Sequence, residues 1–423
     1  MKTYNVRTIC RLCNSNKIKL LLDFGLMPLA GGFIHTEDIP FEKKFPLRLF
    51  FCEKCALVQV VDIIPQEILF RDYRYTSSTT KTLSEHFRDY AKDIQDKFLD
   101  KNSFVVEIGS NDGVLLSPLK ELNVNALGVE PASNIVSIAT SKGLKVLNDF
   151  FNVKTAREVV NQYGLADAIL ANNVLAHIDD MNGIIEGIKI LLNKDGVLIF
   201  EVQYFLDLVK DLQYDFIYHE HMSYYTIKPL IKFFEKHGMK IFDVKDVSIH
   251  GGSIRVYVTS ESNKKYKILD SVKIHLQKEE DMGLHTFSGL SNFSQKVKIH
   301  RDKLVKILNK FKSEGKKICG YGASGRSVTL TNYCNIGQET LEYIIDSSPE
   351  RYGRVMPGTH VKIMSPEYLK LNKADVMLIL AWTYLEEILK KEQWFWEDGR
   401  EGVVPFPNVA IITKEDICLN QLA

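Results

Sequence analysis

The sequence of 423 residues has no long apolar segment and almost no net charge. No stretch approaches about 18 uninterrupted apolar residues, and the N-terminal MKTYNVRTIC has no apolar core, so we expect neither a spanning helix nor a signal peptide. Lys and Arg number 54 against 53 Asp and Glu, which gives a net charge of +1. The chain as a whole therefore has no attraction to nucleic acid or to an anionic membrane, and we expect a cytoplasmic protein.

Cysteine is scarce, and four of the seven lie in two C-x-x-C pairs near the N-terminus, Cys10 with Cys13 and Cys52 with Cys55. In a reducing compartment such pairs indicate metal binding rather than disulfides. Two tight turns that each present two sulfurs suit one tetrahedral Zn²⁺ ion, so we predict a structural zinc site. Redox or merely buried cysteines are the alternative, although thioredoxin-type dithiols need only one such pair.

The chain is long enough for two to four domains, and its 45% hydrophobic and 25% charged residues are the ordinary mixture of a globular protein. Residues 1–70 are rich in Gly, Pro and Cys and show little helical periodicity, as expected of a small metal-stapled module. A helix is predicted between residues 75 and 101, because Leu83, Phe87, Tyr90 and Ile94 recur at helical spacing after a Ser/Thr cluster.

Strands and helices then alternate twice. The first series contains the apolar runs SFVVEIG, NALGVEP, ADAILANNVL and GVLIFEVQ, and KIFDVKDVSI with GSIRVYVTS is predicted to close its edge as an antiparallel pair. A helical tract over 266–311 precedes a second series, KKICGYG, LEYIIDSSP, DVMLILAW and NVAIIT. We therefore predict an α/β protein in which two Rossmann-like domains, residues 71–262 and 263–423, follow a zinc-binding module, residues 1–70.

The segment EIGSNDG, residues 107–113, follows the first of these strands and precedes a helix. A dinucleotide site would place three glycines in this turn, whereas Glu107 before Gly109, together with Glu130 at the end of the next strand, suits S-adenosylmethionine. Glu130 would accept hydrogen bonds from the ribose hydroxyls. A plain strand-to-helix turn with an exposed acid is the alternative.

A complete G-x-G-x-x-G sequence, Gly320 to Gly325, opens the second series, and Asp346 ends the strand that follows. Taken alone, this pattern predicts NAD binding. The same turn also serves other phosphates or close packing, and a chain with one cofactor site seldom needs a second. Its backbone N–H groups and the positive charge of Arg326 would suit the nucleotide end of a substrate.

Proton-active side chains are concentrated in Tyr218-His219-Glu220-His221, beyond the fourth strand of the first series. Histidines at i and i+2 do not have zinc-protease spacing, and lone histidines are usually structural, but four such groups in a row favour an active site. His177 follows another strand of the same series and could join that pocket.

The segments EIGSNDG, LGVEPA, NNVLAHI, YHEHMSYY, HGGSIRVYV and GYGASGRS together resemble the S-adenosylmethionine-dependent sugar C-methyltransferases. The resemblance is strongest to the deoxysugar C-3′-methyltransferases, which act on nucleotide-linked 4-keto sugars, and it covers nearly the whole chain. It implies a zinc-binding module, a central class I methyltransferase domain and a C-terminal Rossmann-like domain that holds the nucleotide-sugar rather than NAD.

The resemblance also implies site residues. The four cysteines fall on the family's zinc ligands. The methyl-donor site is expected to contain Tyr73, Tyr75, Ser77, Glu107, Gly109, Asn111, Glu130, Asn172 and Asn173. The active-site positions are His177, Tyr218, Glu220 and His221, and we predict that Gly322, Ser324, Gly325 and Arg326 bind the substrate.

The predicted reaction is methylation of the carbon next to a keto group, C-3′, of a nucleotide-linked deoxysugar. His221 is the predicted base, Glu220 orients it, and Tyr218 and His177 are donors near the keto oxygen. An NAD-dependent sugar oxidoreductase that uses residues 320–325, or a zinc-anchored nucleotide-binding scaffold without turnover, are the alternatives. We expect a monomer or weak homo-oligomer with no nucleic-acid or membrane partner.

Overall fold

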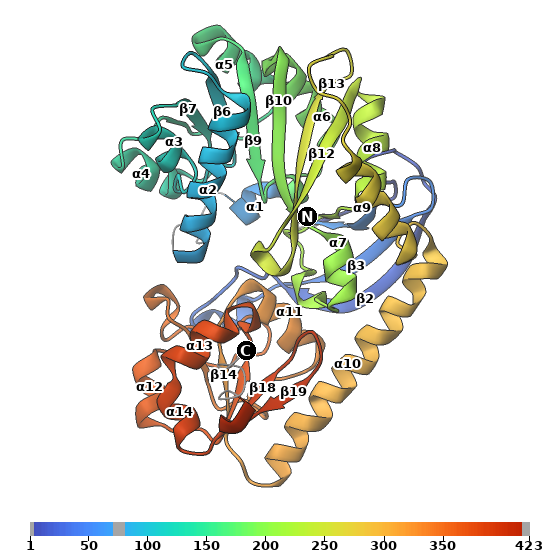
Figure 1. Ribbon diagram of the computed structural model, residues 1–423. Helices are drawn as coiled ribbons and strands as arrows, with labels where there is room; N and C mark the ends of the chain where they lie inside the picture. The colour runs from blue at the N-terminus through green and yellow to red at the C-terminus, as the bar shows by residue number, and fades with distance from the viewer. Residues whose placement is uncertain (1–3, 71–80, 417–423) are drawn as a thin grey trace. The chain divides into compact units, whose positions relative to one another are not determined.

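The computed structural model describes residues 4–70 and 81–416 (Figure 1). The chain packs into two compact units, each assembled from three stretches of sequence. Unit 1 contains Met1–Lys19, Phe50–Leu206 and Met222–Gly289, and unit 2 contains Leu20–Leu49, Asp207–His221 and Leu290–Ala423. The predicted division of the chain at residues 70/71 and 262/263 follows chain order and stays a prediction.

The main sheet of unit 1 has seven strands in the order β12–β13–β10–β9–β6–β7–β8. They are β6 (Phe104–Ile108), β7 (Asn125–Val129), β8 (Val146–Leu147), β9 (Ala166–Asn172), β10 (Leu192–Gln203), β12 (Met239–Val247) and β13 (Ser253–Ser260). The first five pair in parallel, and β12 and β13 form the predicted antiparallel edge. The chain reverses its strand order between β6 and β9, and ligands of such sheets bind beyond the carboxyl ends at that point.

Helices cover the sheet of unit 1, from the blue α2 through teal and green to the dark gold α9 in Figure 1. They are α2 (Lys81–Phe98), α3 (Leu116–Glu121), α4 (Ser133–Ser141), α5 (Val153–Tyr163), α6 (Met181–Leu191), α8 (Ile227–Lys236) and α9 (Asp270–Asp281). The apolar residues of α2 that predicted a helix, among them Phe87 and Ile94, are buried in one core with Val105, Leu170 and Ile199 of the strands. This burial confirms the predicted amphipathic helix.

The cysteine pairs belong to short strands and turns of unit 1. Strand β1 (Asn5–Val6) pairs with β5 (Asp62–Ile63), and β4 (Val58–Val60) pairs with β11 (Ser223–Tyr224); both pairs are antiparallel. Strand β2 (Ile18–Pro28) and strand β3 (Lys44–Cys52) complete a sheet in the order β11–β4–β3–β2, and the short helix α1 (Gln66–Phe70) follows. Because the unit boundaries fall inside β2 and β3, the chain enters and leaves unit 2 within these strands.

Unit 2 has a six-stranded sheet in the order β16–β15–β14–β17–β18–β19. Its strands are β14 (Ile318–Tyr321), β15 (Ile344–Ile345), β16 (Ile363–Met364), β17 (Val376–Ile379), β18 (Glu401–Val404) and β19 (Ala410–Ile412), and only the β18–β19 pair is antiparallel. Its helices are α11 (Gly325–Tyr333), α12 (Pro366–Leu371), α13 (Leu385–Lys391) and α14 (Gln393–Glu397), and α7 (Phe205–Lys210) and α10 (Phe287–Ser313) enter it from unit 1. This second parallel sheet is the predicted second Rossmann-like unit.

The helical tract predicted over 266–311 consists of two helices, α9 and α10. Gly283 follows α9 with φ +72°, a left-handed conformation that ends a helix and that glycine adopts without strain. Strands β8, β16 and β18 were not predicted. Strands β8 and β16 have only two residues each, which is too short for a periodic pattern. Within residues 4–70 and 81–416, no helix combines the length and the apolar character needed to cross a membrane.

Candidate active site and metal centre

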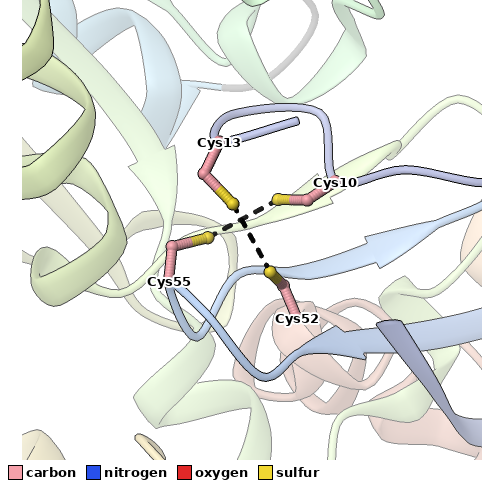
Figure 2. Close-up of side chains that lie close together, drawn as sticks. All are labelled: Cys10, Cys13, Cys52 and Cys55. Carbon is pink, nitrogen blue, oxygen red and sulfur yellow. Dashed lines mark hydrogen bonds between the residues drawn. The ribbon is translucent and has the colours of Figure 1, made fainter. Parts of the chain in front are cut away.

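The four N-terminal cysteines converge on one point in unit 1. Figure 2 shows their sulfur atoms directed toward one another from two turns, with Sγ separations of 3.5 Å for Cys10–Cys55 and 3.6 Å for Cys13–Cys52. All four Sγ atoms lie within 4.8 Å of one another. A tetrahedral Zn²⁺ ion with Zn–S bonds of about 2.3 Å separates its sulfur ligands by about 3.8 Å, so the residues fit the predicted ion.

Both cysteine turns have the same local backbone design. In the first, the N–H of Asn14 donates to the carbonyl of Cys10 at 3.0 Å, and in the second the N–H of Ala56 donates to the carbonyl of Cys52 at 2.8 Å. Asn14 and Ala56 have positive φ values of 56° and 71°, which close each turn tightly behind its cysteines. Four thiolates leave no coordination position for water or substrate, and this indicates a structural rather than a catalytic metal.

The predicted methyl-donor residues meet at the carboxyl ends of β6, β7 and β9. Gly109 follows β6 with φ +66°, and a Cβ atom there would lie 2.1 Å from Cγ2 of Val174. The Glu130 carboxylate, after β7, accepts hydrogen bonds from the backbone N–H groups of Asn111 and Ala132, both at 3.0 Å. The glycine turn and the second acid are therefore one hydrogen-bonded assembly, and the predicted contact of Glu130 with a ribose stays a prediction.

Buried polar atoms of this assembly lack a hydrogen-bond partner within the described part of the chain. The Asn172 amide donates to Oε1 of Glu107 at 3.4 Å. Oε2 of Glu107 and Oδ1 of Asn172 have no hydrogen-bond partner among residues 4–70 and 81–416. Burial raises the pKa of Glu107 well above its usual range and also raises the pKa of Glu130. Buried acceptors without partners are costly, so the site fits a ligand that brings hydroxyl or amino donors, as S-adenosylmethionine does.

The other predicted donor-site residues are less informative. Asn173 follows β9 with φ 55°, and its N–H donates to the carbonyl of Glu201 at 2.8 Å, so its backbone helps to shape the edge of the site. Tyr73, Tyr75 and Ser77 lie outside the described residues, and their roles stay predictions.

In unit 2, Tyr218 and His221 form a direct pair. The Tyr218 hydroxyl lies 2.9 Å from Nε2 of His221, and Nδ1 of His221 lies 3.0 Å from the carbonyl oxygen of Phe216. A carbonyl only accepts, so Nδ1 carries the hydrogen and Nε2 of the neutral ring holds a lone pair. Tyr218 thus donates to Nε2, and this nitrogen is in the state that a general base requires.

Glu220 and His177 have pKa values shifted by burial. Burial raises the pKa of Glu220 to about 7, although the backbone N–H of Gly31 donates to it and opposes that shift. Burial also lowers the pKa of His177 to about 4, which keeps its imidazole neutral at physiological pH. The group that orients Nδ1 of His221 is the Phe216 carbonyl, whereas the sequence analysis assigned that role to Glu220. The predicted roles of Glu220 and His177 stay predictions.

The G-x-G-x-x-G turn of unit 2 is packed closely against protein. A Cβ atom on Gly322, whose φ is +98°, would lie 2.3 Å from Cβ of Ala381, and one on Gly325 would lie 3.3 Å from Cβ of Ala30. Ser324 caps α11 by accepting from the backbone N–H of Ser327. These contacts give the glycines a packing role, whatever ligand the turn also binds.

The acid that would bind an NAD ribose is paired with an arginine. Asp346 accepts from the N–H of Ala323 at 2.7 Å and from Nη1 of Arg351 at 3.2 Å. Arg351 also donates to the carbonyl of Ala323 at 2.7 Å, so this side chain connects Asp346 to the glycine turn. This arrangement opposes the alternative in which the turn binds NAD.

Sequence reasoning missed a polar cluster beside Arg326. Nη2 of Arg326 donates to Thr383 at 2.8 Å, and the indole N–H of Trp382 donates to Asp215 at 2.8 Å. Nη1 of Arg326 and Oδ1 of Asp215 have no hydrogen-bond partner within the described part of the chain, and burial raises the pKa of Asp215 to about 6. Trp382 and Thr383 lie just beyond β17, so the rule that ligands bind beyond parallel strand ends could have found them.

Comparison with protein families divides the sequence into three matches. Residues 10–70 match a zinc binding domain, residues 83–244 match a methyltransferase domain, and residues 248–407 match the C-methyltransferase C-terminal domain. The first match and the geometry of the four sulfurs agree on a structural Zn²⁺ site.

Among curated proteins, the chain is similar to C-methyltransferase NovU of Streptomyces niveus. The two are 30% identical over 408 residues, which are 96% of this chain and 97% of the relative. A ubiquinone biosynthesis O-methyltransferase of Colwellia psychrerythraea is 20% identical over 168 residues, 35% of this chain and 66% of that protein.

Solved structures of methyltransferases also match. An S-adenosylmethionine-dependent methyltransferase of Thermotoga maritima has a TM-score of 0.31 and 18% identity over 41% of this chain and 88% of its own. A magnesium protoporphyrin IX methyltransferase of Synechocystis has a TM-score of 0.31 and 12% identity over 42% of this chain and 78% of its own.

Proposed function

The chain belongs to the family of S-adenosylmethionine-dependent C-methyltransferases, and from that premise we propose that it methylates a nucleotide-linked 4-keto deoxysugar at C-3′. C-3′ is next to the keto group, so its hydrogen is weakly acidic and removal of that hydrogen gives an enolate. The methyl donor supplies an electrophilic sulfonium methyl group. The protein must supply a base for the C–H proton and donors for the enolate oxygen.

The hydrogen-bonded pair of Tyr218 and His221 carries this proposal. Nε2 of His221 is unprotonated and accepts from the Tyr218 hydroxyl, and the Phe216 carbonyl accepts from Nδ1–H on the opposite side of the ring. Nε2 takes the C-3′ proton, and the resulting imidazolium is stabilised by the Phe216 carbonyl and by the Glu220 carboxylate. The Tyr218 hydroxyl donates to the enolate oxygen. A phenol suits this role because an unperturbed phenol holds its proton until about pH 10.

Binding of the nucleotide end is assigned to the turn before α11 and to Arg326. The segment that carries Tyr218 begins at η4 (Tyr214–Phe216), which packs against α11, and the Thr329 hydroxyl donates to the carbonyl of Ile217 at 3.0 Å. The unpartnered Nη1 of Arg326 suits a phosphate oxygen, and Gly322, Ser324 and Gly325 bring backbone N–H groups at the start of the helix. Sugar and nucleotide would thus contact adjacent elements of unit 2.

A panel of nucleotide-linked 4-keto sugars tests the proposal. With S-adenosylhomocysteine in the donor site and the substrate in D₂O, the enzyme should exchange the C-3′ hydrogen, and with S-adenosylmethionine it should form a C–C bond at that carbon. His221→Asn should bind both ligands and lose exchange and methylation by about 10²–10⁴-fold, the range of a general base. Tyr218→Phe should slow both less.

Methylation of oxygen by the wild-type enzyme, or undiminished exchange in His221→Asn, would contradict this mechanism. A cytoplasmic location, a monomeric or weakly associated state, and the lack of a nucleic-acid partner stay predictions from the sequence. Size-exclusion chromatography with light scattering tests the oligomeric state.

A further inference from the structure

Arg11 lies between the zinc ligands Cys10 and Cys13, and its side chain is fully buried, with 0% exposure. Its guanidinium donates to four acceptors of unit 1: the Met222 carbonyl at 2.7 Å, the Val60 carbonyl at 3.0 Å, Oδ1 of Asp179 at 3.1 Å and Oε1 of Gln59 at 3.2 Å. The zinc-bound turn is therefore tied directly to three other segments of the unit.

One of these segments is the peptide that follows the proposed base. Met222 comes directly after His221, and its carbonyl accepts from the N–H of Val60 at 3.0 Å in addition to Arg11. Its N–H donates to the carbonyl of Ala176 at 2.8 Å, and Ala176 directly precedes His177. The backbone of Met222, directly after the proposed base, is thus held by hydrogen bonds on both sides.

The second segment follows β9 and brings Asp179 to the guanidinium of Arg11. Asp179 is two residues after His177, accepts from Arg11 and also accepts from Arg7 at 2.8 Å. Its side chain is 35% exposed, so one carboxylate that is partly in water is the only formal charge among the four acceptors of Arg11.

Burial of a guanidinium has a large desolvation cost. Removing an ion from water costs several kcal/mol, and an apolar residue of similar volume is often at least as stabilising. Arginine offers five N–H donors in a rigid plane, which fix several acceptors in one geometry in a way that an apolar side chain cannot. The contacts of Arg11 thus indicate that it fixes the positions of its acceptors, rather than that it increases the stability of the folded protein.

We propose that Arg11 is a positioning residue for methyl transfer. Its guanidinium connects the rigid turn of the zinc ligands Cys10 and Cys13 to the backbone next to His221 and His177, and so fixes that backbone. This inference rests on the proposed function, since it takes those two histidines as active-site groups. A Zn²⁺ ion on the four thiolates would hold the turn, and Arg11 connects the turn to Met222. A displacement of about 1 Å at a reacting group can reduce a rate about 100-fold, so small movements of this backbone matter.

The test compares Arg11→Lys with Lys19→Met, a control in the same part of the chain. Lysine keeps the charge but cannot reach four acceptors in one plane, whereas Lys19 has a 53% exposed side chain and pairs with Glu53 at the surface. We expect Arg11→Lys to keep one zinc per chain, and its Kd for S-adenosylhomocysteine and its KM to stay within about threefold of wild type, while kcat and C-3′ hydrogen exchange fall together by about 10- to 100-fold. Lys19→Met should leave all of these values unchanged.

Amide hydrogen exchange gives a readout that needs no substrate. In Arg11→Lys, the amide of Met222 should exchange at least about tenfold faster than in wild type or Lys19→Met, because its local opening becomes easier. Asp179→Asn, which keeps a neutral oxygen for Arg11, should show the same changes in smaller size. It serves as the second variant if Arg11→Lys does not fold.

Two outcomes would overturn the inference. Loss of zinc or of donor binding in proportion to activity would make Arg11 a structural residue of the metal module, and unchanged kcat with unchanged Met222 exchange would give it no positioning role. A wild-type enzyme that exchanges no C-3′ hydrogen would instead contradict the proposed function, and the amide exchange of Met222 would still decide whether Arg11 holds this backbone.

Discussion

The turn after β6 in unit 1 and the turn after β14 in unit 2 have nearly the same architecture. Each contains a glycine with a left-handed backbone, Gly109 at φ +66° and Gly322 at φ +98°. In each, an acid beyond the next strand accepts an N–H from the turn, at 3.0 Å for Glu130 and 2.7 Å for Asp346. Both acids are 6% exposed.

The two turns differ in what surrounds them. In the second turn, Arg351 forms an ion pair with Asp346 and also donates to the carbonyl of Ala323 in the turn itself. In the first turn, a neighbouring acid, Glu107, keeps a buried oxygen without a partner among the described residues. Protein side chains, Val174 and Ala381, lie against both glycines, so the glycines alone do not distinguish the turns. The partners of the neighbouring acids do.

The largest expected effect is that of Gly109→Ala. The new Cβ would meet Val174 at 2.1 Å in a backbone conformation that alanine disfavours, so the turn must move. We expect the Kd for S-adenosylhomocysteine, measured by calorimetry, to rise by at least about 100-fold, as a displaced contact geometry can cost. Sugar-nucleotide binding should stay near the wild-type value.

Gly238→Ala is the matched control for this change. Gly238 has φ +69°, and a Cβ atom there would have no neighbour within 4 Å, so it carries the same backbone cost without the clash. If Gly238→Ala weakened donor binding as much as Gly109→Ala, the position of Gly109 at the ligand would be refuted. Adding Val174→Ala to Gly109→Ala should restore part of the affinity.

Gly322→Ala should act on stability rather than on the methyl donor. Its Cβ would lie 2.3 Å from Cβ and 3.0 Å from the backbone nitrogen of Ala381, and backbone cannot easily retreat. We expect a loss of about 1–3 kcal/mol in the free energy of unfolding, the usual cost of overpacking, with an unchanged Kd for S-adenosylhomocysteine. Gly353→Ala, at φ +76° in open space, is the control for thermal denaturation.

Much of the fold could be predicted because long periodic segments dominate it. Strands β6, β7, β9 and β10 are apolar runs that each precede a helix, and the pattern of α2 places Phe87 and Ile94 on one buried face. The sequence does not reveal the exchange of residues 20–49 and 207–221 into unit 2, because this depends on packing between segments far apart in the chain. Two-residue strands such as β8 and β16 carry no periodic pattern.

The candidate site was predictable where short motifs carry the chemistry. Two C-x-x-C pairs are enough to indicate a metal site, whereas the donor-site roles of Glu107 and Glu130 stay predictions. The Phe216 carbonyl that orients His221 could not be predicted, because any residue type can supply a carbonyl. Asp215 was overlooked for a similar reason, since its partner Trp382 is 167 residues away.

A milder test compares the two acids directly. Glu130→Gln keeps the size of the side chain but replaces a charged acceptor near the predicted ribose. The Kd for S-adenosylhomocysteine should rise by about tenfold, which corresponds to the lower end of the about 1.5–3 kcal/mol that charged hydrogen bonds contribute. Asp346→Asn should leave that Kd unchanged. Equilibrium dialysis with NAD should detect no binding to either variant or to wild type. NAD binding that Asp346→Asn abolishes would restore the dinucleotide interpretation of the second turn.

The smallest expected effect concerns Glu220, which accepts from Gly31, next to the Ala30 that packs on the second turn. Burial raises the pKa of Glu220 from 4.5 to about 7, so folding favours its neutral form. That contribution to stability is complete below pH 4.5 and is lost as the pH rises through 7, and the melting temperature of Glu220→Gln should therefore depend less on pH from 5 to 8 than that of wild type.

Activity should change in the opposite direction with pH. If the Glu220 carboxylate stabilises the imidazolium of His221, wild-type kcat/KM rises a few-fold as the pH increases through about 7, and Glu220→Gln lacks that part of the rise. Other groups can also titrate in this range, so the comparison is the difference between the two pH profiles rather than either profile alone. Superimposable profiles of activity and melting temperature would remove Glu220 from the mechanism and leave the Phe216 carbonyl as the group that supports the base.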